Sequence, residues 1–368
     1  MMKRLGYVLV LLLAVAGHAA EVRSPVAPSD GVSSPAAVER GRMIFHDPRL
    51  SSSRTHHCGS CHKPEFGWGD GKRVSDGVGG RTTRNSPTLI NSGYLTNLFH
   101  DKRSQLLEGQ AGQPMQSVVE LGQDNVGSVV RRFARVPEYQ QRFAEVFGRQ
   151  VNATDMAKAI AAFERTLVST DAPIDRAVEW EASPTEPGKW FYTIQPAVDF
   201  EFTPEQRRGF DIFFGRGGCI ACHHGPDYRH DAPLNNGMGF YVGFTDDSGR
   251  EGISDRRSDL RAFAVPTLRE LARTGPYGHA GHLPDLRSVA DHYSAPPVDP
   301  FRDARVQPLN LSDADKAALT AFLSTAFQGR NYPDVGPPAV LPADPPGTQQ
   351  VQQVNQNTGR RGLRRGRR

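Results

Sequence analysis

Two copies of the sequence Cys-x-x-Cys-His, at residues 58–62 and 219–223, constrain this chain more than any other feature. Together they use all four cysteines. Each cysteine pair can form thioether bonds to one haem, and the adjoining histidine then lies beneath the porphyrin as an iron ligand. Disulfides or a zinc site are the alternative use of four cysteines, and the repeated spacing disfavours both. The predicted attachment residues are Cys58, Cys61, Cys219 and Cys222, with His62 and His223 as iron ligands.

The surroundings of the two motifs also repeat. An amphipathic helix precedes each motif, with Ser34 as the expected start of the first and Thr203 as the expected start of the second. A second apolar-periodic segment closes each unit, at 154–167 and at 312–327. Helix, motif, loop and packing helix is the arrangement with which a small cytochrome c encloses its haem. We therefore expect an all-α fold of two cytochrome-c-like haem domains packed around a shared interface.

The domain boundaries follow from this repeat. We expect a signal peptide at 1–20, a flexible segment at 21–34, an N-terminal haem domain at 35–171, a linker at 172–199, a C-terminal haem domain at 200–331 and a disordered Pro/Gln/Arg-rich tail at 332–368.

The first twenty residues have the pattern of a secretory signal. Lys3 and Arg4 precede an apolar stretch, and small residues follow it. A membrane anchor is the alternative, but the stretch is shorter than the ~20 residues that a spanning helix needs. The sequence thus predicts export to the periplasm without a membrane span.

The formal charge of +4 depends on the two ends of the chain. Eight of the 44 basic residues lie in the leader and the tail, which leaves 36 basic against 40 acidic residues elsewhere. A mildly acidic body does not favour nucleic acid as a partner.

Four further sequence blocks accompany the motifs. They are Arg-Asn-Ser-Pro-Thr at 84–88, the stretch 110–122, Val-Pro-Thr-Leu-Arg at 265–269 and Thr-Gly-Pro-Tyr at 274–277. With these blocks the chain resembles the bacterial di-haem cytochrome c peroxidases and their MauG-type relatives over residues 36–329. The resemblance implies peroxide chemistry at the N-terminal haem and electron delivery through the C-terminal haem.

The resemblance assigns roles to individual residues. Gln110, Pro114 and Glu120 match the distal pocket of the peroxide-binding haem, with Glu120 as the acid/base. Without the resemblance, Glu120 would be interpreted as an exposed loop carboxylate. A calcium site between the domains is implied by Asn85, Thr274 and Pro276, which would offer oxygen ligands.

The second axial ligand of the C-terminal haem is implied to be Tyr293. Typical peroxidases of the family have methionine here, whereas MauG-type enzymes have tyrosine. A phenolate favours ferric iron, and a thioether favours ferrous iron. His279, His282 and His292 are competing ligands, and a packed aromatic is the alternative role for Tyr293.

Two further positions depart from the family pattern. Residues 75–80 contain no histidine where resting peroxidases carry a removable distal ligand, so we expect an open N-terminal iron that needs no reductive activation. His100 stands where the family usually has a tryptophan between the haems, which disfavours hole sharing. Trp68 lies near the first motif and could substitute, but ordinary packing is the simpler role.

The predicted function is a periplasmic peroxidase that reduces hydrogen peroxide. Its electrons would come from a small donor protein, a cytochrome or a cupredoxin, through the C-terminal haem. One alternative is a MauG-like oxidase that uses peroxide to modify residues of a partner protein. The other is a non-catalytic di-haem electron carrier. The sequence does not decide whether the chain forms a homodimer.

Overall fold

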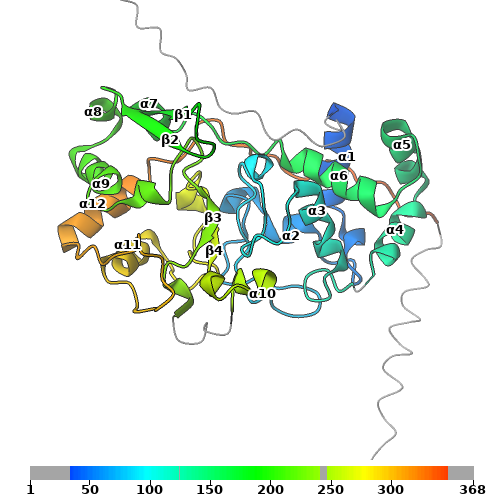
Figure 1. Cartoon of the computed structure of the whole chain (residues 1–368). Coiled ribbons are helices and arrows are strands. Elements are labelled where there is room, and N and C mark those ends of the chain that lie inside the picture. Colours follow the sequence, from blue (N-terminus) through cyan, green and yellow to red (C-terminus); the bar gives the residue numbers. More distant parts are fainter. Residues whose placement is uncertain (1–33, 124, 241–246, 347–368) are drawn as a thin grey trace, which may run out of the picture.

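The chain forms two halves that lie side by side, the N-terminal half at the right of Figure 1 and the C-terminal half at the left. The computed structural model describes residues 34–123, 125–240 and 247–346. The predicted signal peptide, nearly all of the segment expected to be flexible and the tail from residue 347 lie outside the described residues. Within the described residues, no helix combines the length and apolar composition that crossing a membrane requires.

The N-terminal half contains the helices α1 (Pro35–Phe45), α2 (Cys58–Cys61), α3 (Leu107–Gly112), α4 (Val126–Ala134), α5 (Pro137–Phe147) and α6 (Ala153–Glu164). The C-terminal half contains α7 (Pro173–Ala177), α8 (Val198–Glu201), α9 (Pro204–Phe214), α10 (Glu251–Ser254), α11 (Leu286–Ser294) and α12 (Asp313–Leu323). Short 3-10 helices are η1 (Pro48–Leu50), η2 (Pro64–Phe66), η3 (Ser92–Tyr94), η4 (Pro114–Gln116), η5 (Cys219–Ala221), η6 (Met238–Phe240), η7 (Arg257–Asp259) and η8 (Leu271–Arg273).

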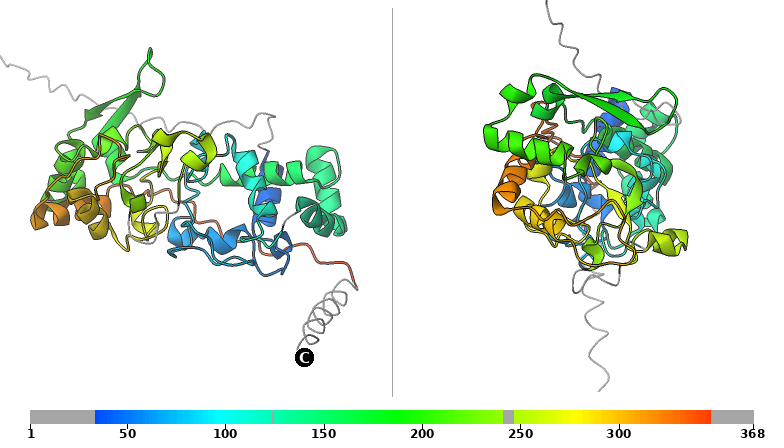
Figure 2. Two further views of the ribbon diagram at one scale, coloured as in Figure 1. Left: turned by 60° about the horizontal axis from the view of Figure 1, so that its bottom comes forward. Right: turned by 60° about the vertical axis from the view of Figure 1, so that its left-hand side comes forward.

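The fold is mainly helical, and the expectation of an all-α fold was too narrow. Strands β1 (Val178–Ala182) and β2 (Trp190–Ile194) form an antiparallel hairpin, which projects from the C-terminal half in Figure 2. Strands β3 (His230–Leu234) and β4 (Phe263–Val265) form a second antiparallel pair. The hairpin is rich in aromatic side chains, which favour strands because they pack on a pleated surface.

The helix before each motif crosses the helix that closes the same half. Both first helices begin at the predicted caps, with the Ser34 hydroxyl accepting from the Ala37 amide and the Thr203 hydroxyl from the Gln206 amide. At each crossing a glycine lets the two backbones touch. A Cβ on Gly41 would lie 1.8 Å from the Ala159 carbonyl oxygen of α6. The equivalent contact brings Gly209 of α9 against α12.

Each half has its own apolar core. Large buried side chains of the first core are Phe45, Trp68, Phe133, Phe143 and Phe163. Those of the second core are Phe210, Phe213, Tyr228, Phe322 and Phe327. The chain therefore builds two separate cores, one around each motif.

The segment at 172–199 is not a plain linker. Its residues form α7, the hairpin and α8, and Ile174, Val178 and Val198 are buried in the second core. Trp180 packs edge-on against Tyr228, with ring centroids 5.6 Å apart. Apolar burial thus makes this segment part of the C-terminal half.

The segment at 332–346 corrects the expectation of disorder from residue 332 onward. It runs back from the C-terminal half along the N-terminal half (Figure 1). Its backbone carbonyls accept hydrogen bonds from arginines: Arg42 donates to Gly336 and Pro337, both at 3.1 Å. Arg49 pairs with Asp344 at 2.8 Å. Proline-rich backbone offers unpaired carbonyls, so these donors hold it in place; we call residues 332–346 the C-terminal strap.

Candidate functional site

The first CxxCH motif forms α2 and leads into a tight loop at 62–69. His62 Nδ1 lies 2.9 Å from the carbonyl oxygen of Trp68, which is fully buried and has a φ of 61°. The Thr88 hydroxyl donates to the carbonyl of the preceding Gly67 at 2.6 Å. Burial lowers the pKa of His62, which favours the neutral imidazole. Because Nδ1 contacts a carbonyl, Nε2 is the ring nitrogen that is available to ligate a haem iron.

The second motif repeats this arrangement. His223 Nδ1 lies 2.9 Å from the carbonyl oxygen of Tyr228, again fully buried and again with a positive φ, 48°. The Thr267 hydroxyl donates to the carbonyl of the preceding Asp227 at 2.7 Å. Burial lowers the pKa of His223 to about 4. In both halves, therefore, a buried carbonyl contacts Nδ1 of one histidine, which leaves its Nε2 available to ligate iron.

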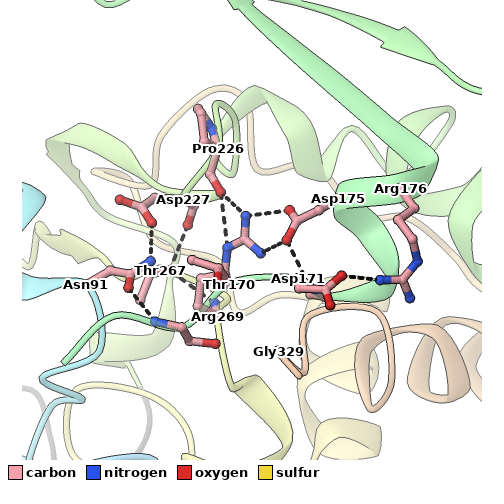
Figure 3. Close-up of polar contacts among 12 residues, drawn as sticks. Asn91, Thr170, Asp171, Asp175, Arg176, Pro226, Asp227, Thr267, Arg269 and Gly329 are labelled. Atoms are coloured by element: carbon pink, nitrogen blue, oxygen red, sulfur yellow. Dashed lines mark hydrogen bonds and ion pairs between the residues drawn. The ribbon is translucent and has the colours of Figure 1, made fainter. Parts of the chain in front are cut away.

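Arg269 braces the second loop from below (Figure 3). Its guanidinium forms two hydrogen bonds with Asp175, at 2.6 and 2.7 Å, and its Nε donates to the Pro226 carbonyl at 3.1 Å. From the N-terminal half, the Asn91 amide donates to the Asp227 carboxylate at 2.6 Å. A bidentate arginine pair gives a rigid support to the loop that follows His223.

The residues around the first motif fit a haem. All four cysteines lie within the described residues as free thiols, so the disulfide alternative has no support. Gln110 Oε1 and Glu164 Oε2 are buried and have no hydrogen-bond partner among the described residues. Buried polar atoms are nearly always satisfied. These two oxygens are therefore consistent with a polar group that the haem or its ligands supply.

Glu120 lies in the loop after η4. Its backbone amide donates to the Ser117 hydroxyl at 3.1 Å, and its carbonyl accepts from the Val78 amide at 3.0 Å. Burial raises the pKa of the Glu120 carboxyl. The charge of Arg103 and a side-chain hydrogen bond between Ser117 and the carboxyl oppose this rise. The Glu120 charge acts on both thiols of the first motif, so the carboxyl is close to the predicted haem. Such a group can accept a proton from a bound substrate and return it.

The loop without histidine, residues 75–80, holds the Glu120 segment. Backbone bonds join Val78 to Glu120 and Gly79 to Val119, each at 3.0 Å. A Cβ on Gly77 would lie 2.2 Å from the Val119 carbonyl oxygen. The glycine-rich loop can thus lie directly against the backbone that carries Glu120, and it contains no histidine.

Gly79→Ala tests this contact. A Cβ at position 79 would lie 2.2 Å from the Val118 carbonyl oxygen, so the loop has to move. We expect the free energy of unfolding to fall by about 1–3 kcal/mol and the peroxide reaction to slow. Chemical denaturation and stopped-flow absorbance measure the two effects. Gly336→Ala is the control, because a Cβ there meets nothing within 4 Å, and an equal loss in both variants would contradict the argument.

Gln110 and Pro114 lie just before the Glu120 loop. Gln110 is in α3, and Pro114 begins η4, whose Gln116 is followed directly by this loop. The Pro114 carbonyl accepts from the Ser117 amide at 3.1 Å, so the turn at Pro114 connects to the residue that bonds Glu120. The three predicted pocket residues are therefore linked through one short segment of backbone.

The predicted calcium residues lie at the contact between the halves. The Asn85 amide nitrogen donates to the His279 carbonyl at 2.7 Å. The Asn85 side-chain nitrogen donates to the Lys72 carbonyl at 2.7 Å, so a cation at this position would meet Oδ1 and not the nitrogen. Thr274 is beside Gly67, where an added Cβ would meet its Cγ2 at 2.6 Å. The described residues hold no cluster of three His, Cys, Asp or Glu side chains around a metal position, so a calcium ion here would need amide and backbone oxygens as ligands.

Tyr293 lies near the end of α11. The Asn236 side-chain amide donates to its hydroxyl oxygen at 3.1 Å. His292 Nε2 lies 3.0 Å from the Asn236 carbonyl, and the His279 ring stacks on Phe263 with centroids 3.8 Å apart. A donor at the phenol oxygen stabilises a phenolate. The contact at Nε2 occupies His292, but the buried Nε2 of His279 has no hydrogen-bond partner among the described residues, so His279 remains a competing ligand.

His100 joins the halves. Its Nε2 lies 2.9 Å from the Asn85 carbonyl, and its own carbonyl accepts from the Ala264 amide at 2.7 Å. Burial lowers the pKa of His100, which keeps the ring neutral. Trp68 is a core residue whose indole nitrogen donates to Pro333 at 3.0 Å. These contacts give both residues structural roles.

Sequence reasoning missed Glu164, the last residue of α6. It is 4% exposed, and burial raises its pKa to about 8 against the opposing charge of Arg165. Its charge acts on the Cys58 thiol, so it is near the first motif. The sequence offered one signal of this burial, because Glu164 directly follows Phe163 in a helix whose other residues are mostly buried.

Three comparisons with known proteins agree with this geometry. The family described as "Di-haem cytochrome c peroxidase" matches residues 35–183. Methylamine utilization protein MauG of Methylorubrum extorquens is 32% identical over 302 residues, which cover 81% of this chain and 80% of that protein. Cytochrome-c peroxidase IdrP1 of Pseudomonas sp. strain SCT is 31% identical over 328 residues, 80% of this chain and 82% of that protein.

Solved structures give the same result for the fold. A MauG-like protein associated with microbial copper homeostasis has a TM-score of 0.70 at 26% identity, covering 84% of this chain and 94% of that one. The diheme peroxidase BthA of Burkholderia thailandensis has a TM-score of 0.67 at 20% identity, covering 88% and 94%. At that identity the likeness concerns the fold alone.

Proposed function

Because this chain belongs to the di-haem cytochrome c peroxidase family, whose members are haem-dependent oxidoreductases, we propose that it reduces hydrogen peroxide at the haem of Cys58, Cys61 and His62. The observation that carries this proposal is the Glu120 carboxyl. It is partly buried, has a raised pKa and acts on both cysteines of the first motif. A protein that only carries electrons does not need a proton-transferring carboxyl near its iron.

The chemistry divides between haem and protein. When bound, the haem supplies an iron for peroxide and the electrons that break the O–O bond. Glu120 takes a proton from one peroxide oxygen and returns it to the other. Gln110, whose buried Oε1 has no partner among the described residues, orients the peroxide, and Pro114 fixes the turn between them. One peroxide takes two electrons and two protons and leaves as two waters.

The C-terminal half delivers the electrons. Cys219, Cys222 and His223 would hold its haem, and the Tyr293 oxygen, to which Asn236 donates, would be a further ligand of the iron. A small cytochrome or cupredoxin is the donor, and the leader peptide places the reaction in the periplasm. Calcium at Asn85, Thr274 and Pro276 stabilises the contact between the halves.

The test is a stopped-flow absorbance record of the pure, fully ferric protein mixed with hydrogen peroxide. Since residues 75–80 carry no histidine and their loop is bonded to the Glu120 backbone, we expect high-spin haem at rest and a fast reaction without prior reduction. Two low-spin haems and no reaction until one haem is reduced would overturn the open-site part of the proposal. A protein that stays inert even when half-reduced is an electron carrier.

A second candidate function is the peroxide-dependent oxidation of a partner protein. The phenol at position 293, with an amide donor on its oxygen, favours it because phenolate ligation stabilises oxidised iron. His100 weighs against it, since imidazole is harder to oxidise than indole. Peroxide consumption that needs a small donor protein supports the first function; covalent change in a partner supports the second.

A further inference from the structure

The loop that follows each ligand histidine is bonded to a segment that is distant from it in the sequence. The first loop, 62–69, meets the C-terminal strap at two adjacent strap residues. The Tyr332 hydroxyl donates to the Pro64 carbonyl, and the Trp68 indole nitrogen donates to the Pro333 carbonyl at 3.0 Å. The strap thus gives one hydrogen bond to the loop and receives one from it.

Trp68 connects the strap to the histidine. Its carbonyl oxygen is the group that His62 Nδ1 contacts at 2.9 Å. Its ring is fully buried between Phe45 and Phe163, with centroids 6.0 and 5.9 Å away. Because ring and carbonyl belong to one residue in a strained, positive-φ conformation, fixing the indole also fixes the direction of the carbonyl.

The loop after His223 is also held by a residue that is distant in the sequence. Asn91 of the N-terminal half donates to the Asp227 carboxylate at 2.6 Å, as Figure 3 shows. Asn91 is itself held, because its amide donates to the Leu167 carbonyl at 2.8 Å and its Oδ1 accepts from the Ser169 amide at 3.0 Å. Asp227 immediately precedes Tyr228, whose carbonyl His223 contacts.

We propose that each ligand histidine is positioned by a segment that is distant in the sequence, the C-terminal strap for His62 and Asn91 of the N-terminal half for His223. Tyr332 and Pro333 set the His62–Trp68 contact, and Asn91 sets the His223–Tyr228 contact. The proposal rests on His62 and His223 being the iron ligands. A hydrogen bond at Nδ1 raises the basicity of a ligating imidazole, so its geometry tunes the iron. The first iron is therefore sensitive to the C-terminal strap, and the second iron is sensitive to how the N-terminal half docks on the second loop.

The test compares three minimal changes with matched controls. Tyr332→Phe and Trp68→Phe each remove one hydrogen bond to the strap. Asn91→Asp keeps the side-chain shape but turns the donor toward Asp227 into an acceptor. The controls are Tyr192→Phe on the half-exposed hairpin and Asn97→Asp, an exposed asparagine that also has a positive φ.

The readouts are the reduction potential of each haem in the holo-protein and the iron–histidine stretching band of the ferrous N-terminal haem. We expect Tyr332→Phe and Trp68→Phe to lower that stretching frequency and to change the reduction equilibrium constant of the N-terminal haem at least threefold, leaving the C-terminal haem unchanged. Asn91→Asp should do the opposite, changing the C-terminal haem alone. The controls should move neither.

Two results would overturn the proposal. One is a shift of both haems together in every variant, which indicates general loosening. The other is a loss of thermal stability with both haems unchanged, which gives these bonds a structural role only. Neither readout depends on peroxide, so the inference can fail while the peroxidase function stands. If His62 or His223 fails to ligate iron, the spectra of the unmodified protein show it first.

Discussion

Glu120→Gln is expected to slow the reaction of the ferric protein with hydrogen peroxide by about 10²–10⁴-fold. Glutamine keeps the shape of the side chain but cannot accept a proton. The backbone contacts of residue 120, to Ser117 and Val78, do not involve the carboxyl and should persist. Stopped-flow absorbance at the Soret band measures the rate, and the haem content and resting spectrum should match the unmodified protein.

The pH profile gives the same residue a second test. Glu120 must be ionised to accept a proton, and burial raises its pKa above the ordinary value for a glutamate. The rate should therefore fall as the pH drops through this raised pKa and level off above it. Glu120→Gln should lack this step.

Glu65→Gln is the control for both measurements. Glu65 is an exposed glutamate in η2, beside the first motif, and the substitution makes the same change in charge. Its rate and pH profile should match the unmodified protein. If Glu120→Gln retains the full rate, the proton is carried by another group, and the buried Glu164 is then the first to examine.

The local sequence predicted what depends on neighbouring residues. The helix caps at Ser34 and Thr203 are signals within a few residues of the helices that they begin, and the structure confirms both. The two motifs likewise fix their own loops, because the contacts His62–Trp68 and His223–Tyr228 each span only a few positions. Such features need no knowledge of distant parts of the chain.

Contacts between distant residues were not predictable in this way. The C-terminal strap has a proline-rich composition typical of disorder, yet Arg42 and Arg49, far earlier in the chain, bind it. The hairpin at 178–194 is similar, since Trp180 packs on Tyr228, which nothing near Trp180 indicates. Glu164 was missed because its importance comes from its burial near Cys58 and not from a motif.

Tyr293→Met is expected to raise the reduction potential of the C-terminal haem by a few hundred millivolts, since axial ligands set haem potentials over a range of about 0.8 V. Methionine removes the anionic oxygen that favours ferric iron, together with the acceptor for the Asn236 amide. Spectroelectrochemical titration of the two haems measures the change. The potential of the N-terminal haem should move much less.

Tyr293→Phe separates ligation from packing. It removes the oxygen and keeps the ring, so a ligating tyrosine predicts that the C-terminal haem loses its low-spin character in this variant but keeps it in Tyr293→Met. Unchanged spectra and potentials in both variants would show that the ligand lies elsewhere. His279 and His282 would then be the residues to replace, because His292 Nε2 contacts the Asn236 carbonyl, whereas the buried Nε2 of His279 has no hydrogen-bond partner among the described residues. A raised potential in Tyr293→Met would also hold electrons at the C-terminal haem, so turnover with a donor should become limited by transfer between the two halves.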